Sequence, residues 1–269
     1  MNLLGRSFKQ AYAYLFARKL FYPAHLFLYK LSMSGLGIRN SENDYLSGEK
    51  AFIRYLINNG KLNDGVILDI GANIGHYSIM LRKQQIRLPL FAFEPHPAAF
   101  KKLEAAARTY RFTPVPLGAG EVPATAAIYD YAGDGGSEHA SIYKEVIEQL
   151  HEGQAEEKHI TLTTIDDFIA GNQLSKIALL KIDTEGHELG VLKGAQTAIE
   201  RGLIAAVQIE FNEMNVISRT FFRDIVAVLP GYDFYRLLPD GLKPLGKYNV
   251  TQYEIFAFQN IVALRKSAR

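Results

Sequence analysis

The sequence predicts an α/β fold in which a mostly parallel sheet carries helices on both faces, preceded by a helical arm. Between residues 47 and 231, short apolar runs alternate with stretches of helical period, which is the pattern of strand–helix–strand units. The apolar run at 66–70 ends in a glycine-spaced turn before a helix. We therefore divide the chain into an N-terminal arm, residues 1–46, and one domain, residues 47–269.

The composition fits a globular domain of this size. With 269 residues, 48% of them hydrophobic, the chain is long enough to bury a full core. Its net charge of +2 gives no sign of a nucleic-acid partner, which usually requires a concentrated basic surface. The chain contains no cysteine, which excludes disulfides, thiolate metal sites and cysteine nucleophiles.

The arm, whose helical part we expect at residues 1–40 with an interruption at Pro23, is basic and aromatic. No acidic residue occurs before Glu42. Basic side chains are interleaved with aromatic ones: Arg6, Lys9, Arg18, Lys19, Lys30 and Arg39 with Phe8, Tyr12, Tyr14, Phe16, Phe21, Tyr22, Phe27 and Tyr29. This mixture suits the surface of an anionic membrane, and packing on the same chain or on a second copy is the alternative.

The arm gives no sign of a membrane span or a signal peptide. No apolar run approaches the ~20 residues that cross a bilayer. Arg18, Lys19 and Pro23 interrupt the apolar stretches. We therefore expect a cytoplasmic protein, with peripheral contact at the inner face of the membrane if the arm binds lipid.

The elements of the domain follow in order. After a helix at 47–59, strands are expected at 66–70, 89–93, 112–117, 177–183, 204–211, 232–238 and 254–264, and helices at 76–85, 97–109, 164–171, 187–201 and 218–229. The last two strands lack a helical connection, which predicts a closing antiparallel hairpin. Between 129 and 160 the periodicity is lost, which predicts a cover loop over the active site or an insertion.

The turn after the first strand predicts a nucleoside pocket. Asp69, Gly71 and Gly75 form an Asp-x-Gly-x-x-x-Gly pattern, and glycines let the backbone approach a ligand closely. The next strand ends in Glu94, where a carboxylate is expected to bind the hydroxyls of a ribose. The pattern lacks the Gly-x-Gly-x-x-Gly spacing that holds a dinucleotide pyrophosphate, so S-adenosylmethionine fits better than a nicotinamide cofactor. Glycines that serve only packing are the alternative.

A second cluster of polar residues follows the strand at 177–183. Asp183, Glu185, His187 and Glu188 lie within six residues, and the next strand adds Glu210. Ligands of open α/β sheets bind beyond the carboxyl ends of the strands, so these side chains are expected to face the same crevice as Asp69 and Glu94. For Glu188 we expect a solvent-facing or helix-capping position.

Together, Asp69 to Tyr77, Phe93-Glu94-Pro95, Thr163 to Phe168 and above all Lys181-Ile182-Asp183-Thr184-Glu185-Gly186-His187-Glu188 resemble the FkbM family of S-adenosylmethionine-dependent methyltransferases. The resemblance covers roughly residues 48–262. It implies a Rossmann-like, seven-stranded class I methyltransferase sheet with a last antiparallel strand beside the fifth. It also implies O-methylation of a hydroxyl, often on a sugar or polyketide.

The resemblance assigns residues to the two ends of the expected site. Contacts to the methyl donor are expected from Asp69, Gly71, Asn73, Gly75, Tyr77, Glu94 and Pro95. Contacts to the acceptor are expected from Ser137, His139 and Glu210. The chain departs from the family at Val115-Pro116-Leu117-Gly118, where members commonly carry an asparagine, so backbone groups are expected to bind the adenine.

Methyl transfer to a hydroxyl requires a base for the hydroxyl proton. His187 has the ordinary pKa best suited to this role, and Asp183 or Glu185 can orient it or replace it. A divalent metal held by Asp183, Glu185, Glu210 and also His187 is a less favoured alternative. A small-molecule or glycan acceptor is expected, while a binding module without activity and a nicotinamide-dependent oxidoreductase remain the competing functions.

Overall fold

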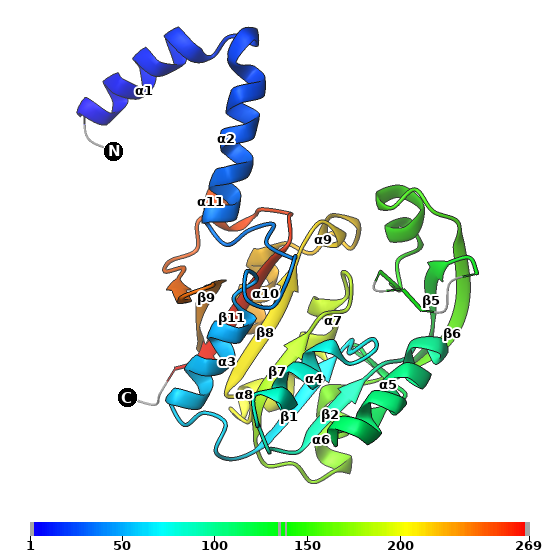
Figure 1. The fold of residues 1–269 in the computed structure, drawn as a ribbon. Helices are drawn as coiled ribbons and strands as arrows, with labels where there is room; N and C mark the ends of the chain where they lie inside the picture. Colours follow the sequence, from blue (N-terminus) through cyan, green and yellow to red (C-terminus); the bar gives the residue numbers. More distant parts are fainter. Residues whose placement is uncertain (1–2, 134–135, 138, 267–269) are drawn as a thin grey trace.

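The computed structural model describes residues 3–133, 136–137 and 139–266, and its centre is an eight-stranded sheet (Figure 1). The strand order is β10 (Gly241–Pro244), β9 (Tyr232–Leu238), β11 (Gln259–Arg265), β8 (Ala206–Phe211), β7 (Ile177–Ile182), β1 (Val66–Ile70), β2 (Leu90–Phe93) and β3 (Thr113–Val115). Strands β3, β2, β1, β7 and β8 are parallel, and β11 is antiparallel to both β8 and β9. The predicted Rossmann-like sheet is confirmed, including the antiparallel strand beside the fifth.

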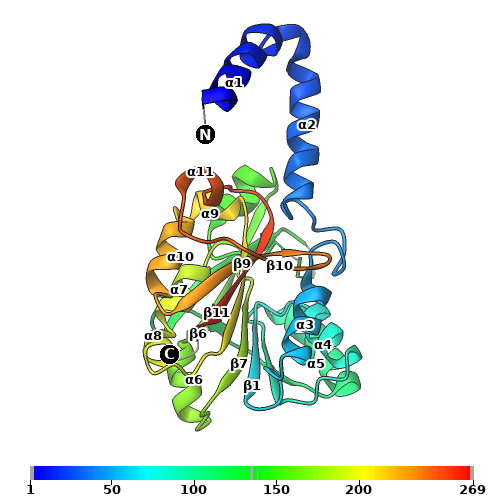
Figure 2. The same ribbon diagram turned by 90° about the vertical axis from the view of Figure 1, so that its left-hand side faces the viewer.

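Helices cover both faces of the sheet, as predicted (Figure 2). One apolar core joins the sheet to α3 (Glu49–Asn58), α4 (His76–Lys83) and α5 (Pro97–Tyr110). The other core joins it to α6 (Ile165–Gly171), α7 (Glu188–Lys193), α8 (Gln196–Glu200) and α10 (Phe222–Val228). Alternate residues of β1 enter the two cores, Ile67 the first and Leu68 the second, because successive side chains of a strand point to opposite faces.

Several boundaries differ from the prediction for local reasons. The helix expected at 187–201 is broken into α7 and α8 near Gly194, where a Cβ would lie 1.9 Å from the carbonyl oxygen of Gly120. The helix expected at 218–229 is preceded by the short α9 (Met214–Ile217). The strand expected at 254–264 begins only at 259, because residues 254–258 form an irregular connection after α11 (Val250–Tyr253).

The segment 129–160 contains more regular structure than its sequence predicts. Its two ends, residues 129–131 and 155–160, belong to a second, three-stranded sheet of β4 (Gly118–Ala119), β6 (Ala155–Thr163) and β5 (Ala124–Tyr131). A π-helical turn, η2 (Val146–Leu150), precedes β6. Strands β5 and β6 are antiparallel. Their side chains are largely charged, small or half exposed, so the alternation that identifies a strand is weak.

The arm forms α1 (Leu3–Phe16), a 3₁₀ turn η1 (Lys19–Phe21) and α2 (Tyr22–Gly35), which project from the domain in both views (Figures 1 and 2). The break between the helices lies before Pro23, not at it, and Pro23 occupies the first turn of α2, where its missing N–H has no helical partner to lose. Within the described part of the chain, every helix is too short or too polar to traverse a bilayer.

Candidate functional site

A cavity of about 870 Å³ lies at the carboxyl ends of the central strands. This volume is typical of sites for small-molecule ligands. Most residues predicted for the site line it: Gly71, Asn73, Tyr77, Glu94, Pro95, Ser137, His139, Asp183, Glu185, His187 and Glu210. Asp69 and Gly75 do not line it. The sequence therefore located the cavity, and the two residues outside its wall have other roles.

Both glycines of the first turn are required by close packing. Gly71 has φ +77°, and a Cβ there would lie 1.7 Å from the carbonyl oxygen of Asp183. Gly75 has φ +92°, and a Cβ there would lie 2.9 Å from the side chain of Leu103 on α5. Gly71 thus brings the turn after β1 against the end of β7, whereas Gly75 seats α4 on α5 outside the cavity.

Glu94 follows β2 and presents a prearranged carboxylate to the cavity. Its Oε2 accepts the backbone N–H of Asn73 at 2.9 Å, and its Oε1 accepts that of His96 at 2.7 Å. Burial raises the pKa of Glu94 to about 7, against the lowering effect of these two hydrogen bonds. Each carboxylate oxygen still has a lone pair available, so Glu94 can accept further hydrogen bonds from two hydroxyls of a ligand.

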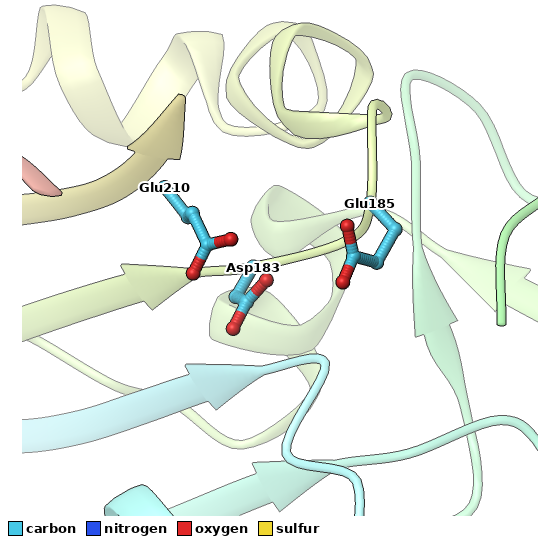
Figure 3. Close-up of side chains that lie close together, drawn as sticks. All are labelled: Asp183, Glu185 and Glu210. Atoms are coloured by element: carbon cyan, nitrogen blue, oxygen red, sulfur yellow. The ribbon is translucent and has the colours of Figure 1, made fainter. Parts of the chain in front are cut away.

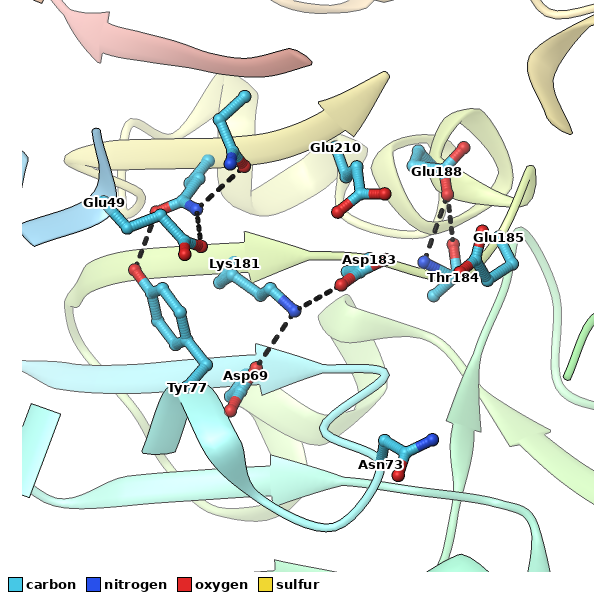
Figure 4. A network of polar contacts seen from close by, with 12 residues as sticks. Glu49, Asp69, Asn73, Tyr77, Lys181, Asp183, Thr184, Glu185, Glu188 and Glu210 are labelled. Carbon is cyan, nitrogen blue, oxygen red and sulfur yellow. Dashed lines mark hydrogen bonds and ion pairs between the residues drawn. The ribbon is translucent and has the colours of Figure 1, made fainter. Parts of the chain in front are cut away.

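Asp69 lies behind the cavity wall. It is fully buried, its Oδ2 accepts the hydroxyl of Ser78 at 2.6 Å, and its Oδ1 lies 3.7 Å from Nζ of Lys181 (Figure 4). Asp69 was expected to contact the methyl donor, but its carboxylate faces protein groups and does not line the cavity. Its observed contacts instead fix the position of Lys181.

Lys181 is a central residue of the site that the sequence reading did not assign. Its Nζ lies 2.9 Å from Oδ2 of Asp183 and over the ring of Tyr77 at 5.4 Å from the centroid. Burial alone would lower the pKa of Lys181, but the charges of Asp183 and Asp69 outweigh it and raise the pKa. The sequence could have indicated this role, because Lys181 lies within the otherwise apolar strand Ile177–Ile182. A buried charge in such a strand requires partners of opposite charge.

A chain of hydrogen bonds extends from Tyr77 across the sheet. The hydroxyl of Tyr77 donates to Oε1 of Gln208 at 2.7 Å, and Nε2 of Gln208 donates to Glu49 at 2.9 Å and to Asn260 at 3.1 Å (Figure 4). Burial raises the pKa of Glu49. Glu49 and Asn260 line the cavity, so this chain joins α3, α4, β8 and β11 at one side of the site.

Glu188 holds the turn after β7 in place. Its Oε1 accepts the backbone N–H groups of Thr184 at 3.1 Å and Gly186 at 2.9 Å, and its Oε2 accepts Nδ2 of Asn215 at 2.9 Å. The solvent-facing position is wrong, because only 1% of Glu188 is exposed. Glu188 also does not act as the N-cap of α7, because the N–H groups that it binds lie in the turn before the helix. The turn keeps Glu185 at φ +52°, a left-handed conformation that costs about 1–2 kcal/mol for a residue with a Cβ.

Three carboxylates meet at the ends of β7 and β8. One oxygen from each of Asp183, Glu185 and Glu210 lies within 4.8 Å of the others (Figure 3). Nδ2 of Asn212 donates to Glu210 at 2.9 Å and lies 3.3 Å from Oε2 of Glu185. We call Asp183, Glu185 and Glu210 the carboxylate cluster.

The carboxylate cluster disfavours full ionisation. Burial, followed by the charges of Asp183 and Glu185, raises the pKa of Glu210 well above its ordinary value. Burial, followed by the charges of Asp183 and Glu188, raises the pKa of Glu185 to about 7, against a lowering contact with His139. Like charges at this spacing oppose the ionisation of all three acids together, so the cluster suits a shared proton or a cation.

The two histidines expected at the site differ in their contacts. Nδ1 of His139 lies 3.8 Å from Oε1 of Glu185, and its ring stacks on His151 at 4.2 Å. His187 lines the cavity, but its ring packs on Gly190, where a Cβ would lie 2.6 Å from Nε2. That Nε2 is buried with no hydrogen-bond partner among the described residues, and burial lowers the pKa of His187. The structure thus pairs an acid of the cluster with His139.

Ser137, in the segment after β5, is hydrogen-bonded to the turn after β1. Nδ2 of Asn73 donates to the carbonyl of Ser137 at 2.7 Å, and the backbone N–H of Ser137 donates to Asp130 at 2.9 Å. The hydroxyl of Ser137 also donates to Asp130, so it already has an acceptor. Residues 134, 135 and 138, which lie beside Ser137 in the sequence, are outside the described residues.

The wall beside Glu94 is apolar. Gly118, Ala119, Ile128, Ile160 and Leu162 line the cavity there. They belong to the three-stranded sheet of β4, β5 and β6. A flat aromatic base fits such a wall, with backbone groups rather than an asparagine side chain available for hydrogen bonds.

The chain is similar to several known methyltransferases. A family model described as the methyltransferase FkbM domain matches residues 69–235. The hexuronic acid methyltransferase AglP of Haloferax volcanii is 31% identical over 167 residues, which are 61% of this chain and 63% of that protein. The chain therefore spans less than two thirds of that relative.

Two further proteins are similar to the chain. The 31-O-demethyl-FK506 methyltransferase FkbM of Streptomyces tacrolimicus is 28% identical over 205 residues, covering 67% of this chain and 76% of that protein. The crystal structure of an O-methyltransferase from Bacillus cereus in complex with SAH superposes with a TM-score of 0.44 at 10% identity, covering 97% of each chain.

Proposed function

The chain belongs to the FkbM family of methyltransferases, and from that premise we propose that it transfers the methyl group of S-adenosylmethionine to a hydroxyl of a sugar or a similarly polar acceptor. One observation carries the proposal: a single cavity has a prearranged carboxylate, Glu94, on one side and the carboxylate cluster on the other. The name of AglP, a hexuronic acid methyltransferase, supports a sugar as the acceptor.

The residues on the Glu94 side fit the donor. The Glu94 carboxylate is oriented by the N–H groups of Asn73 and His96, so it is available to accept both ribose hydroxyls. The apolar wall beside Glu94 suits adenine. Lys181 and Tyr77, which also line the cavity, contact each other. When bound, S-adenosylmethionine supplies a methyl group whose bond to sulfur breaks as the acceptor oxygen bonds to the carbon.

The carboxylate cluster would bind the acceptor and remove its proton. We propose Glu185 as the base, because its pKa of about 7 matches the working pH and its oxygens face the cavity. Asp183 is held by Lys181 and would orient the acceptor hydroxyl. Glu210, held protonated by burial and its neighbours, would donate a hydrogen bond to a second acceptor oxygen. His139 lies close enough to receive the proton from Glu185.

His187 remains a second choice for the base. Its lowered pKa keeps the imidazole neutral near pH 7, which suits a proton acceptor. However, its ring packs on Gly190, while the members of the cluster approach one another and His139. We therefore place the chemistry on the cluster and assign His187 to the wall of the cavity.

A divalent metal is the alternative occupant of the cluster. The three carboxylates would hold such an ion, since hard cations take oxygen ligands and the spacing of these oxygens is compatible with one shared ion. In that case the ion would lower the pKa of the acceptor hydroxyl. We favour the metal-free mechanism because Lys181 already neutralises Asp183 and a shared proton satisfies the other two acids.

The proposal is tested with labelled S-adenosylmethionine and a panel of saccharides that includes hexuronic acids and neutral hexoses. We expect label in an alkali-stable methyl ether on one class of saccharide. Label recovered as an alkali-labile methyl ester, or in none of the saccharides, would contradict methylation of a sugar hydroxyl.

Thermal shift separates the proposed donor from the competing functions. A ligand at 100 times its Kd stabilises the folded state by about 2.7 kcal/mol, so S-adenosylhomocysteine should raise the melting temperature and NAD should not. Stabilisation by NAD alone would favour an oxidoreductase. Stabilisation by S-adenosylhomocysteine without transfer to any acceptor would favour a binding module.

A further inference from the structure

The arm exposes more large apolar side chains than helices that face only water usually do. Phe8 is 73% exposed, Leu20 81% and Phe27 62%. Other large apolar residues of α1 and α2 are also exposed: Tyr12, Tyr14, Leu15, Phe16, Tyr22, Leu26, Leu28, Tyr29 and Leu31. In both views the two helices stand away from the domain (Figures 1 and 2). Exposed patches of this kind mark interaction sites.

The helices of the arm contact each other, and the base of the arm packs on the domain. The hydroxyl of Tyr12 on α1 lies 3.0 Å from Nε2 of His25 on α2, and the rings of Phe16 and Phe21 are 5.5 Å apart at the corner. At the base, Ile38 is fully buried, and the N–H of Arg39 donates to the carbonyl of Phe258 at 2.7 Å. The base of the arm is therefore anchored on the domain.

The base of the arm leads directly into the wall of the cavity. The residues that follow it, Ser41, Glu42, Asn43 and Asp44, line the cavity, as does Ser47. Helix α2 has 14 residues, which corresponds to a length of about 21 Å. A surface bound by the corner and the outer turns of the arm would thus lie roughly one helix length from the cavity.

The charge of the arm distinguishes between two partners. Every ionised side chain before Glu42 is basic: Arg6, Lys9, Arg18, Lys19, Lys30 and Arg39. Pairing of two such arms would bring like charges together, which opposes self-association. An anionic lipid surface offers the complementary charge and also accepts the aromatic and aliphatic side chains.

We propose that the arm docks the protein on an anionic bilayer surface, with the apolar side chains of α1, the corner and the outer turns of α2 in the interface and the lysines and arginines at the headgroups. The continuity of the arm with the cavity wall then holds the cavity beside the membrane. On the proposed function, this favours an acceptor whose sugar is attached to a lipid.

Vesicle sedimentation with the full chain tests the docking. We expect partition onto vesicles of phosphatidylglycerol and phosphatidylcholine, weaker partition onto phosphatidylcholine alone, and release by salt. Each basic residue near such a surface contributes about fivefold to binding, so the triple variant K9Q/K19Q/K30Q should bind about a hundredfold more weakly. The matched triple variant K101Q/K102Q/K247Q, which removes exposed lysines of the domain, should bind as the parent does.

A second variant tests the apolar contribution. F8S/L20S/F27S changes three exposed side chains, so the domain should keep its melting temperature and its stabilisation by S-adenosylhomocysteine while losing partition. Equal binding of all variants, or equal binding to neutral and anionic vesicles, would overturn the proposal. So would sedimentation equilibrium showing a dimer that F8S/L20S/F27S dissociates, together with no partition onto vesicles.

The two proposals fail in different experiments. Methylation of soluble saccharides without partition onto anionic vesicles would refute the docking and leave the proposed function standing. Partition without transfer of label to any acceptor tested, soluble or lipid-linked, would refute the proposed function and leave the docking standing. If both hold, a lipid-linked saccharide in anionic vesicles should be methylated faster than the same soluble saccharide, and K9Q/K19Q/K30Q should remove that difference.

Discussion

The acidic residues in the two halves of the cavity differ in how their charge is compensated. On the β1–β2 side, each oxygen of Glu94 accepts a backbone N–H, and Asp69 is held by Ser78 and Lys181. On the β7–β8 side, three carboxylates approach within 4.8 Å, and Lys181, Asn212 and His139 are the groups that compensate them. The difference indicates a fixed binding surface for one ligand on the first side and groups poised to exchange a proton on the second.

The largest effect is expected from removing the base on the β7–β8 side. Glu185→Gln keeps the size of the side chain but removes its basicity, so kcat should fall about 10²- to 10⁴-fold while the affinity for S-adenosylhomocysteine stays unchanged. Glu213→Gln, an exposed acid at the rim of the same cavity, is the matched control and should leave kcat within twofold. A Glu185→Gln enzyme with parental kcat would assign the base to another residue, with His187 the first to test.

Lys181 joins the two halves, and its loss should affect folding. Lys181→Met leaves Asp69 and Asp183 without their cation, so the free energy of unfolding in urea should fall by about 3–5 kcal/mol. The control is Lys193→Met, which breaks the exposed pair with Glu121 and should change it by less than about 1 kcal/mol. Equal small changes in both variants would show that the buried pair contributes no more than a surface pair.

Replacement of Glu94 should mainly weaken binding of the donor. Glu94→Gln weakens the hydrogen bonds to the ribose, so the Kd for S-adenosylhomocysteine measured by calorimetry should rise about 10- to 150-fold, equivalent to about 1.5–3 kcal/mol. Asp69→Asn, which alters a carboxylate outside the cavity wall, should change that Kd much less and lower the melting temperature more. The reverse order of effects would restore Asp69 as the direct ligand.

The pH dependence should follow the raised pKa of Glu185. The base acts deprotonated, so kcat should rise with pH through an inflection at about 7, and Glu185→Gln should remove that inflection. Stability should move in the opposite direction. Unfolded glutamates lose their protons near 4.5 and folded Glu94 and Glu185 near 7, so the folded state binds more protons between these values and stability falls as pH rises through this window.

The smallest effect is expected from chelation. With Lys181 and a shared proton balancing the cluster, dialysis against EDTA should leave kcat unchanged. Loss of activity on dialysis and recovery with Mg²⁺ or Mn²⁺ would replace the metal-free mechanism by one in which Asp183, Glu185 and Glu210 hold an ion. Asp183→Asn would then abolish the recovery.

The sequence predicted the central sheet well because its strands are buried on both faces. The continuous apolar runs of β1 and β7 could be recognised without their neighbours. Strand β10 was not predicted, because its four residues form an edge hairpin with no apolar alternation. Strands β5 and β6 were missed as well, because half-exposed strands with charged side chains lack a clear period.

The site was predictable in its location and less so in its contacts. Carboxyl ends of neighbouring parallel strands meet, so the gathering of Glu94, Asp183 and Glu210 followed from their positions after apolar runs. The pairings of Asp69 with Lys181 and of Glu185 with His139 depend on rotamers and on the path of the segment after β5. No local pattern encodes these contacts, since the partners lie 112 and 46 positions apart in the chain.

The contact of Gly71 with the carbonyl of Asp183 has a wider consequence. A methyl side chain at position 71 has no room while the loop after β1 touches the end of β7. The backbones of the turn after β1 and of the end of β7 are thus in van der Waals contact. This contact sets the distance between the proposed donor site and the carboxylate cluster. Redesign of the acceptor preference therefore has to keep glycine at position 71, because a bulkier residue there would force the turn after β1 away from the end of β7.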